Sequence, residues 1–340
     1  MRVLAVTNIY PTPARPSLGT FVEQQVNGLR AAGMTVEVLY VDRREQGMAT
    51  YLRVPNRLRS ALRTFDADVV HVMYGGVMAD IVTRTIDGRP IVLTFHGSDL
   101  LGENSSGPLR RILAQWGVMS SWRAARRAAA VVVVANHLTE ALPRDLDRGK
   151  IRVIPCGIDL ARFVPLPREA CRRQLGWDAD MFCIAFNSNG GNPVKRPALA
   201  RAAVEILNRH GIRAVLKELR GMSNTEVPIW LNASDALLLT SRHEGSPTIV
   251  KEALACNIPV VSVDVGDVRE RIAGITGCHL VAADPDDIAD KLQAALKSTR
   301  RVDGRLRMAE MSIERIASRL KLLYEEVATG RAHSAAARAS

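Results

Sequence analysis

Aromatic residues and cysteines are scarce in this chain of 340 residues. Phe, Trp and Tyr together make up 4%, so there are few side chains on which unpaired bases could stack. No nucleic-acid-binding motif is present either, which argues against a nucleic-acid partner. The cysteines are odd in number and contain no CxxC pair, a pattern that fits neither a disulfide framework nor a zinc site. We expect all five to be packing residues: Cys156, Cys171, Cys183, Cys256 and Cys278.

Long hydrophobic runs are also missing. No apolar stretch approaches the ~18 to 20 residues that a membrane-spanning helix needs. The opening "MRVLAVTNIY" enters a strand-like run at once, without the charged start and apolar core of a signal peptide. We therefore expect a cytoplasmic protein that does not cross a membrane.

Basic residues are in excess, with a formal net charge of +11. This balance favours anionic partners such as nucleoside diphosphates or phospholipid head groups, without choosing among them. Hydrophobic residues make up 47%, as in ordinary globular proteins. Because single cores rarely grow beyond ~250 to 300 residues, the length predicts two domains.

Short β-branched runs alternate with amphipathic stretches in the first part of the chain. A helix is predicted from about Thr20, closing at Gly33, where a left-handed residue suits a helix end. The strand-like runs are apolar throughout, as expected for a parallel sheet covered on both faces. They are "VLAVTNIY", "TVEVLYVD", "DVVHVMYG", "PIVLTFHG" and "AAVVVVAN".

The same alternation of strand-like and helical segments begins again after "IRVIPCGIDLARFVPLPREA", which we interpret as a linker. It includes a helix over about 197–209 closed by Gly211, and a later helix with Asp284 as N-cap. The fold class is therefore α/β, with two Rossmann-like domains. We assign residues 1–160 to the first domain and 161–320 to the second, and expect 321–340 to be the end of a helix and a disordered tail.

The stretch "LLLTSRHEGSPTIVKEALAC" carries the strongest functional signal. A turn at the carboxyl end of a strand is where open α/β sheets bind ligands. We expect Ser246 to cap the following helix and Pro247 to be its first residue. The free amides at the helix start then form a phosphate cradle. The residues of this turn and helix start are Glu244, Gly245, Ser246, Pro247, Thr248, Ile249 and Val250.

Glu252 lies one helical turn beyond Thr248, so its carboxylate can reach a pair of hydroxyl groups such as a ribose presents. From the residues alone, the motif predicts a nucleotide-like ligand with an acid on each flank. The alternative is that Glu244 only caps a turn and Glu252 faces solvent beside Lys251.

The spacing of these two glutamates resembles the Glu, seven residues, Glu signature of the retaining glycosyltransferases of family 4. The resemblance extends along nearly the whole chain. "VIPCGIDLARFVP" is similar to the family's linker, and "LTFHGSDL" to the His-Gly-x-Asp of its acceptor domain. The opening "VTNIYPTPARPSLGTFVEQQVNGLRAAG" is similar to enzymes that build bacterial capsules, teichuronic acids and exopolysaccharides.

The resemblance implies a GT-B fold, with two facing Rossmann-like domains, a cleft between them, and the nucleotide sugar on the second. Glu252 matches the glutamate that binds the donor ribose, and Glu244 the one against the transferred sugar. Lys195 matches the diphosphate-binding lysine. His96 matches the histidine near the sugar's distal hydroxyl, and Gly19 falls in the glycine loop under the diphosphate and the acceptor.

The implied reaction is retaining transfer from a nucleoside diphosphate sugar to a saccharide, lipid-linked, in the synthesis of cell-surface polysaccharide. No cofactor and no metal are expected. Two Asp-x-Asp pairs resemble the metal motifs of the other glycosyltransferase fold. However, Asp66/Asp68 simply precedes a strand and Asp178/Asp180 lies in a linking loop, so we do not predict a metal site there. Two alternatives stay open: a soluble transferase acting on a small molecule, and a non-catalytic homologue that binds saccharide or nucleotide sugar.

The chain departs from the family pattern in "FNSNGGNPVKRP", where no arginine precedes Lys195. Arg196 could supply the missing cation, because a guanidinium can hold two phosphate oxygens. Alternatively, the neutral groups of Asn187, Ser188, Gly190 and Gly191 could replace it. Asp267 also stands where relatives carry a glycine.

The stretch "PLRRILAQWGVMSSWRAARRA" places apolar residues at helical spacing among arginines. This pattern suits a helix at the surface of an anionic membrane, and we expect the protein on the inner face of the cell membrane. A core-packing helix with a basic face is the alternative. The expected contact residues are Arg110, Arg111, Trp116, Trp122, Arg123, Arg126 and Arg127.

Overall fold

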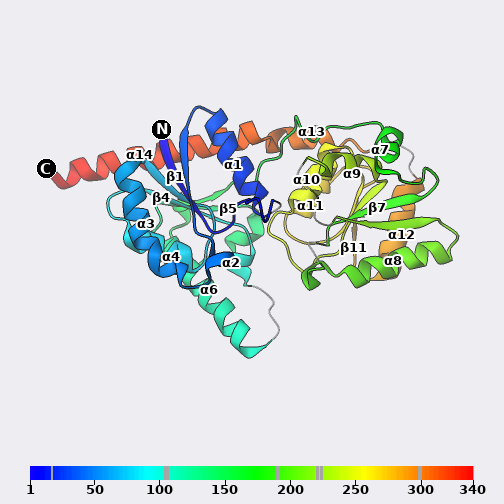
Figure 1. Cartoon of the computed structure of the whole chain (residues 1–340), viewed down its shortest axis with the longest axis horizontal. Coiled ribbons are helices and arrows are strands. Elements are labelled where there is room, and N and C mark those ends of the chain that lie inside the picture. The colour runs from blue at the N-terminus through cyan, green and yellow to red at the C-terminus, as the bar shows by residue number, and fades with distance from the viewer. Residues whose placement is uncertain are drawn as a thin grey trace. The chain divides into compact units, whose positions relative to one another are not determined.

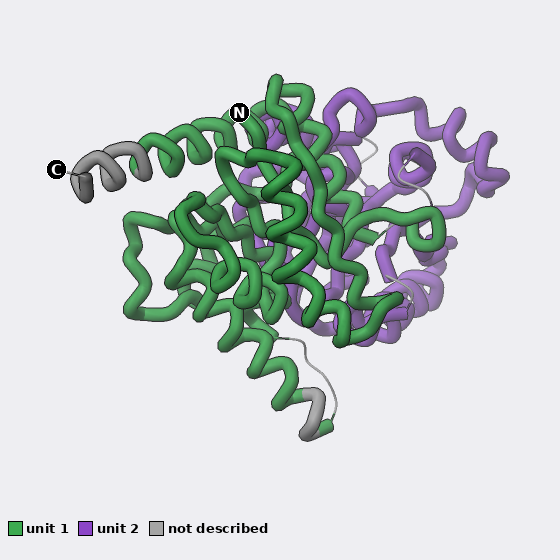
Figure 2. Tube along the Cα trace, turned by 60° about the vertical axis from the view of Figure 1, so that its left-hand side comes forward, with its two compact units in different colours: residues 1–157, 313–340 green, residues 158–312 purple. Residues whose placement is uncertain are grey.

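The protein is described by a computed structural model in which residues 1–16, 18–102, 107–188, 191–219, 222, 225–297 and 301–339 are placed. The chain divides into two compact units (Figure 2). Unit 1 comprises residues 1–157 and 313–340, and unit 2 comprises residues 158–312. Each unit holds one parallel sheet with helices on both faces (Figure 1). The predicted α/β class is confirmed.

Unit 1 is built on a six-stranded parallel sheet in the order β2-β1-β3-β4-β5-β6. Its strands are β1 (Arg2–Thr7), β2 (Thr35–Tyr40), β3 (Val69–Val72), β4 (Ile91–Phe95), β5 (Ala130–Val133) and β6 (Ile151–Val153). Its helices are α1 (Thr20–Ala31), α2 (Arg43–Gln46), α3 (Thr50–Thr64), α4 (Val77–Thr85), α5 (Ser98–Leu101), α6 (Pro108–Arg127) and α14 (Ile313–Ala339), with 3-10 turns η1 (Asn136–Thr139) and η2 (Arg148–Lys150).

Two apolar layers cover this sheet. Helices α3, α4 and α6 pack against one face, and α1 and α14 pack against the other. Helix α1 buries Val22, Val26 and Leu29 at helical spacing, and the chain turns after it at Gly33 with φ 82°. The predicted end of this helix is therefore confirmed.

Unit 2 is built on a five-stranded parallel sheet in the order β11-β10-β9-β7-β8. Its strands are β7 (Phe182–Phe186), β8 (Ala214–Glu218), β9 (Ala236–Leu239), β10 (Val260–Val263) and β11 (His279–Val281). Its helices are α7 (Arg168–Leu175), α8 (Pro197–Arg209), α9 (Val227–Ala233), α10 (Thr248–Ala255), α11 (Val268–Ile272), α12 (Pro285–Lys297) and α13 (Gly304–Met308), with 3-10 turns η3 (Pro193–Lys195) and η4 (Ala309–Met311).

Helices α9 and α10 cover one face of the second sheet, and α8 and α12 cover the other. The predicted cap of α12 is confirmed, because the Asp284 carboxylate accepts from the amides of Asp286 and Asp287, each at 3.0 Å. Helix α8 ends as predicted, and Gly211 follows it with φ 79°.

The structure differs from the predicted organisation at two places. The predicted linker begins with β6, which completes the first sheet beside β5. The division falls after residue 157, not 160. The predicted helix end within 321–340 is confirmed, because it belongs to α14 and buries Leu323 and Tyr324 against the sheet of unit 1. The helix continues through Ala339, where a disordered tail was expected.

No helix in the described part of the chain is both long and apolar enough to cross a bilayer.

Candidate functional site

Two loops of unit 2 meet where its strand order reverses, between β7 and β9. Such a switch point is where open α/β sheets bind ligands. Lys195 follows β7 and Glu244 follows β9, and Lys195 Nζ lies 2.5 Å from Glu244 Oε1. The Ser241 hydroxyl donates to the same carboxylate oxygen at 2.6 Å. The structure thus joins two predicted site residues, 49 positions apart, in one ion pair.

The carboxyl group of Glu252 is buried on α10, with the residue 9% exposed. Burial raises its pKa to about 7, and the positive charges of Lys251 and Arg162 oppose that shift. We find no hydrogen bond to this carboxyl group from any residue that the structure describes. The two carboxyl oxygens are also not among the buried side-chain atoms that lack a partner, so they keep some access to the surface of unit 2 and are suited to accept hydrogen bonds from a ligand's hydroxyl groups. Glu252 is nevertheless largely buried and does not face solvent.

The start of α10 differs from the prediction. Pro247 is the N-cap, Thr248 is the first helical residue, and the Ser246 side chain makes no capping hydrogen bond. Instead the Ser246 hydroxyl donates to Asp267 Oδ2 at 2.7 Å and lies 3.1 Å from Lys251 Nζ. The buried Lys251, one turn along α10, and Asp267 together draw the hydroxyl away from the helix end.

The rest of this turn is tightly packed. Gly245 and Pro247 are buried, and a Cβ on Gly266 would come within 2.8 Å of the Gly245 carbonyl oxygen. The side chain of Ile249 belongs to the core. The backbone amides of Thr248 and Ile249, at the first turn of α10, are suited to hold a phosphate. Val250 donates to the Pro247 carbonyl at 3.2 Å.

Arg196 is not directed into the ligand edge. Its backbone is left-handed, with φ 50°. The guanidinium donates from Nε to the Thr240 carbonyl at 2.5 Å and from Nη2 to the Ser241 carbonyl at 3.0 Å. Burial lowers its pKa, and the nearby charge of Arg242 adds to that shift. In this geometry Arg196 stabilises the chain at the end of β9. The same geometry does not favour Arg196 as a phosphate ligand.

A different arginine lies beside Lys195. Arg242 is exposed, and its backbone amide donates to the Val194 carbonyl at 2.8 Å. Sequence reasoning missed it, because the pairing of the loops after β7 and β9 is not visible in the sequence. Arg242 is a candidate for the cation missing from the loop after β7.

Three further polar atoms are buried without a hydrogen-bond partner in the described part of unit 2. They are Ser188 Oγ, His243 Nε2 and Asp267 Oδ1. Ser188 follows β7, His243 follows β9 and Asp267 follows β10, so all three lie at the carboxyl edge of the sheet. Unsatisfied buried groups are rare in native proteins, and their gathering at this edge fits a polar ligand. The Ser188 hydroxyl thus stays a candidate for the neutral groups that could replace the missing cation, whereas Gly190 lies outside the described residues.

In unit 1, His96 follows β4 and faces its own unit. Its Nε2 lies 3.1 Å from the Met73 carbonyl oxygen, so Nε2 carries the proton. Its Nδ1 lies 3.6 Å from Cys156 Sγ. The ring stacks on Tyr74 at 5.7 Å and contacts Phe21 of α1 at 4.7 Å.

Asp99 holds the His96 loop in place. Its buried carboxylate accepts from the backbone amides of Gly75 at 2.9 Å, His96 at 3.0 Å and Gly97 at 2.9 Å. Burial raises the pKa of Asp99 to about 6, while these three donors oppose the shift. The sequence motif contains Asp99, but its role as the residue that joins the loops after β3 and β4 emerges only from the structure.

Gly19 begins α1 with φ 73°, and a Cβ there would come within 2.7 Å of the Ile9 carbonyl carbon. A glycine is therefore required at this position. Gly19 and His96 belong to unit 1, whereas the other predicted donor residues belong to unit 2.

Comparisons with known proteins match both units. Residues 18–162 match the family described as Glycosyltransferase Family 4, and residues 188–298 match the family described as Glycosyl transferases group 1. The chain is a family 4-type glycosyltransferase. It is 25% identical, over 79% of its length and 82% of the relative, to a glycosyltransferase ascribed to teichuronic acid biosynthesis, TuaC of Bacillus subtilis. It is 29% identical, over 66% of its length and 63% of the relative, to a D-inositol 3-phosphate glycosyltransferase of Actinosynnema mirum.

Solved structures place this family 4-type chain in the GT-B fold. A sucrose-phosphate synthase of Thermosynechococcus elongatus aligns with a TM-score of 0.81 at 18% identity, over 97% of this chain and 100% of that one. HepE of Anabaena, in complex with UDP-glucose, aligns with a TM-score of 0.65 at 16% identity, over 99% and 100% of the two chains. The predicted fold is confirmed by these alignments.

Helix α6 of this glycosyltransferase differs from the predicted membrane helix in its arginines. Arg123 and Arg127 both pair with the buried carboxylate of Asp80, at 3.0 and 2.8 Å. Arg126 pairs with Asp145 at 2.9 Å, and the Trp122 indole donates to the Ala141 carbonyl at 3.0 Å. These contacts hold α6 to unit 1, and two of them supply counter-charges to the buried Asp80 of α4.

The first half of α6 keeps the predicted exposure. Arg111 is exposed, and so are Ile112, Leu113, Trp116 and Met119. The side chain of Arg110 lies outside the described residues.

Proposed function

We propose that this glycosyltransferase transfers a sugar, with retention of configuration, from a nucleoside diphosphate sugar bound by unit 2. The observation that carries the proposal is the carboxyl group of Glu252, which is largely buried, accepts no hydrogen bond from a residue that the structure describes, and lies one helical turn from the amides that open α10. Its place suits a ribose diol, and the amides suit the diphosphate. HepE, which shares the fold, was solved with UDP-glucose.

Lys195 and Glu244 supply the reactive end of this site. The leaving diphosphate gains negative charge as the anomeric bond breaks, so a fixed cation aimed at it lowers the barrier. Lys195 is that cation, with Arg242 beside it. Glu244 would then accept hydrogen bonds from the transferred sugar. No metal or other cofactor enters this proposal.

The proposed acceptor is a saccharide, lipid-linked, in the synthesis of cell-surface polysaccharide. TuaC, ascribed to teichuronic acid biosynthesis, supports this assignment. Exposed Arg111, Ile112 and Trp116 on α6 would provide peripheral contact with an anionic membrane, on its inner face. A small-molecule acceptor is the second candidate, because relatives include D-inositol 3-phosphate glycosyltransferases.

Calorimetric titration with UDP and GDP tests the donor site. Glu252→Ala should weaken binding of the accepted nucleotide by about tenfold to a hundredfold, since a hydrogen bond to a charged group contributes ~1.5 to 3 kcal/mol. Glu205→Ala, an exposed acid on α8, is the matched control. Equal affinity in wild type and Glu252→Ala would rule out the ribose assignment. Release of nucleoside diphosphate from the sugar donor separates an enzyme from a non-catalytic binding homologue.

A further inference from the structure

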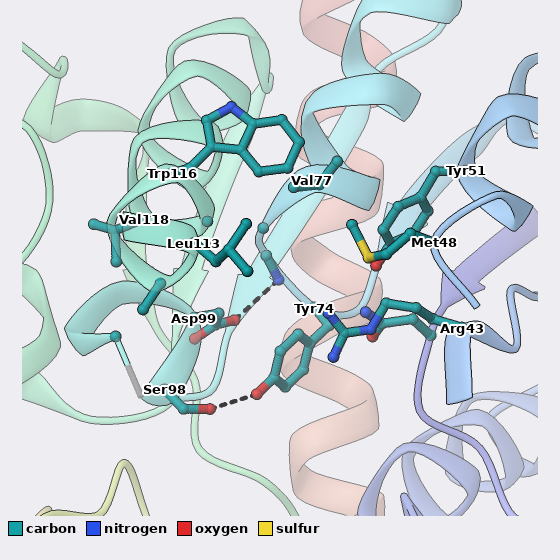
Figure 3. Close-up of a pocket in the computed structure, with 16 residues that line it drawn as sticks. Arg43, Met48, Tyr51, Tyr74, Val77, Ser98, Asp99, Leu113, Trp116 and Val118 are labelled. Carbon is teal, nitrogen blue, oxygen red and sulfur yellow. Dashed lines mark hydrogen bonds between the residues drawn. The ribbon is translucent and has the colours of Figure 1, made fainter. Parts of the chain in front are cut away.

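Unit 1 contains a cavity of about 400 Å³, within the usual size range of small-molecule sites. It lies at the carboxyl ends of β1, β3 and β4, where the order of the first sheet reverses between β1 and β3. Its walls come from helices α2 to α6 and from the loops after β1 and β3 (Figure 3). The apolar side chains that line it are Met48, Tyr51, Val77, Leu113, Trp116 and Val118.

Most polar side chains in this cavity are already engaged within the protein. The Tyr74 and Ser98 hydroxyl groups lie 2.5 Å apart, and Asp99 accepts from three backbone amides. Two groups differ. Asn8 Oδ1 is buried without a hydrogen-bond partner, and Arg43 forms no ion pair with any acid that the structure describes. Figure 3 shows the Arg43 guanidinium directed toward Tyr74 at one side of the cavity.

The apolar lining continues onto the surface. Three side chains belong to both the lining and the exposed surface: Met48 at 50%, Leu113 at 52% and Trp116 at 43% exposure. Exposed apolar side chains that line a cavity are a feature of binding sites.

We propose that this cavity binds the start of the hydrocarbon chain of a lipid-linked acceptor, with the attached phosphate facing Arg43. A bare saccharide would leave the apolar walls uncovered and would find few free polar side chains. A hydrocarbon chain covers those walls, and each buried methylene raises affinity by about fourfold. Arg43 supplies the matching charge for the phosphate. The inference rests on the proposed function for its reaction, but the binding itself can be measured alone.

Calorimetric titration of the full chain with decyl phosphate, below its micelle concentration, tests the proposal. We expect saturable binding of one molecule per chain. Butyl phosphate should bind at least about tenfold more weakly, because fewer methylene groups are buried. Inorganic phosphate should show no heat at the same concentration. Affinity independent of chain length, or displacement of decyl phosphate by maltose or inorganic phosphate, would overturn the proposal.

Matched variants separate the cavity from general adsorption to the surface. Leu113→Gln should weaken decyl phosphate binding at least about fivefold. Met119→Gln, on the same helix and 53% exposed but outside the lining, should change it less than about twofold. Arg43→Gln should weaken binding at least about fivefold, whereas the neighbouring exposed Arg44→Gln should not. Equal effects within either pair would overturn the assignment. All four side chains are exposed, so the fold should persist.

The same variants are titrated with UDP and GDP. Normal nucleotide binding without decyl phosphate binding would remove the cavity assignment and leave the proposed function standing. Binding of decyl phosphate by a chain that binds neither UDP nor GDP would contradict the proposed function and leave the cavity assignment standing.

Discussion

Lys195 Nζ and Glu244 Oε1 lie 2.5 Å apart, and both side chains are largely buried. The pair joins the loops after β7 and β9 at the ligand edge. A diphosphate entering this edge has to compete with Glu244 for the lysine. The two residues should therefore act as a unit, and their substitutions should not be additive.

The first prediction concerns this pair. Lys195→Ala should lower turnover by at least about tenfold, because the leaving diphosphate loses its cation. Glu244→Ala should also lower turnover but should spare binding of the bare nucleotide, since Lys195 is then released to the phosphates. Steady-state rates of donor cleavage and nucleotide titration measure both effects. Full activity in Lys195→Ala would refute the donor-site assignment.

The second prediction distinguishes the two arginines near Lys195. Arg196→Ala should reduce stability by about 1 to 3 kcal/mol, because the buried Thr240 and Ser241 carbonyl groups lose their donors. Nucleotide affinity of the folded variant should change little. Arg242→Ala should leave stability unchanged and weaken nucleotide binding several-fold. Urea unfolding and calorimetry decide between these roles, and the reverse pattern would return the phosphate role to Arg196.

The third prediction concerns pH. His71 on β3 is fully buried, with Nδ1 2.6 Å from the Tyr324 hydroxyl and Nε2 2.7 Å from Thr94 Oγ1. Burial lowers its pKa to about 3, with a smaller effect from His96. Because the folded pKa is below the unfolded one, the unfolded chain binds the extra proton as pH falls below about 6.5. Stability is therefore lost from that pH downward.

The expected loss from this histidine is about 2 kcal/mol between pH 7.5 and pH 5. Asp99 acts in the opposite direction, because its pKa is raised. The comparison is therefore between wild type and His71→Gln at both pH values, by urea unfolding. If the two proteins lose equal stability on acidification, His71 is not the responsible group.

The fourth prediction concerns the contact between α1 and α14. A Cβ on Gly28 would come within 2.3 Å of Ile313 Cγ2. Gly28→Ala should therefore lower the melting temperature, as an overpacked contact does. Combining it with Ile313→Ala should restore part of the loss, because the second change removes the clashing methyl group. A double variant less stable than the sum of both single changes would contradict this explanation.

The sequence predicted those elements whose signals are local. Gly33 and Asp284 mark helix ends through their own backbone or side chain, and both predictions are confirmed. The predictions failed where a distant residue competes. Ser246 has the chemistry of a cap, but Lys251 and Asp267 engage its hydroxyl. Likewise Arg196 serves backbone carbonyls of a neighbouring strand end.

The prediction that the arginines of α6 contact a membrane failed for a related reason. Arginines at helical spacing suit a membrane surface, but the sequence does not reveal that Asp80 lies buried beside them. Trp122 of the same helix is likewise held by the Ala141 carbonyl, whereas Trp116 is exposed, so its contact with a membrane stays a prediction.

Helix α14 has a consequence for biosynthesis. Unit 1 is made from two segments, 1–157 and 313–340, while unit 2 is continuous. During translation, the first sheet and α1 emerge before α14, so the part of the sheet that Ile316, Leu320 and Tyr324 cover stays exposed until α14 has left the ribosome. Unit 2 is complete before then. A nascent chain should therefore protect unit 2 from protease earlier than unit 1, even though unit 1 begins the chain.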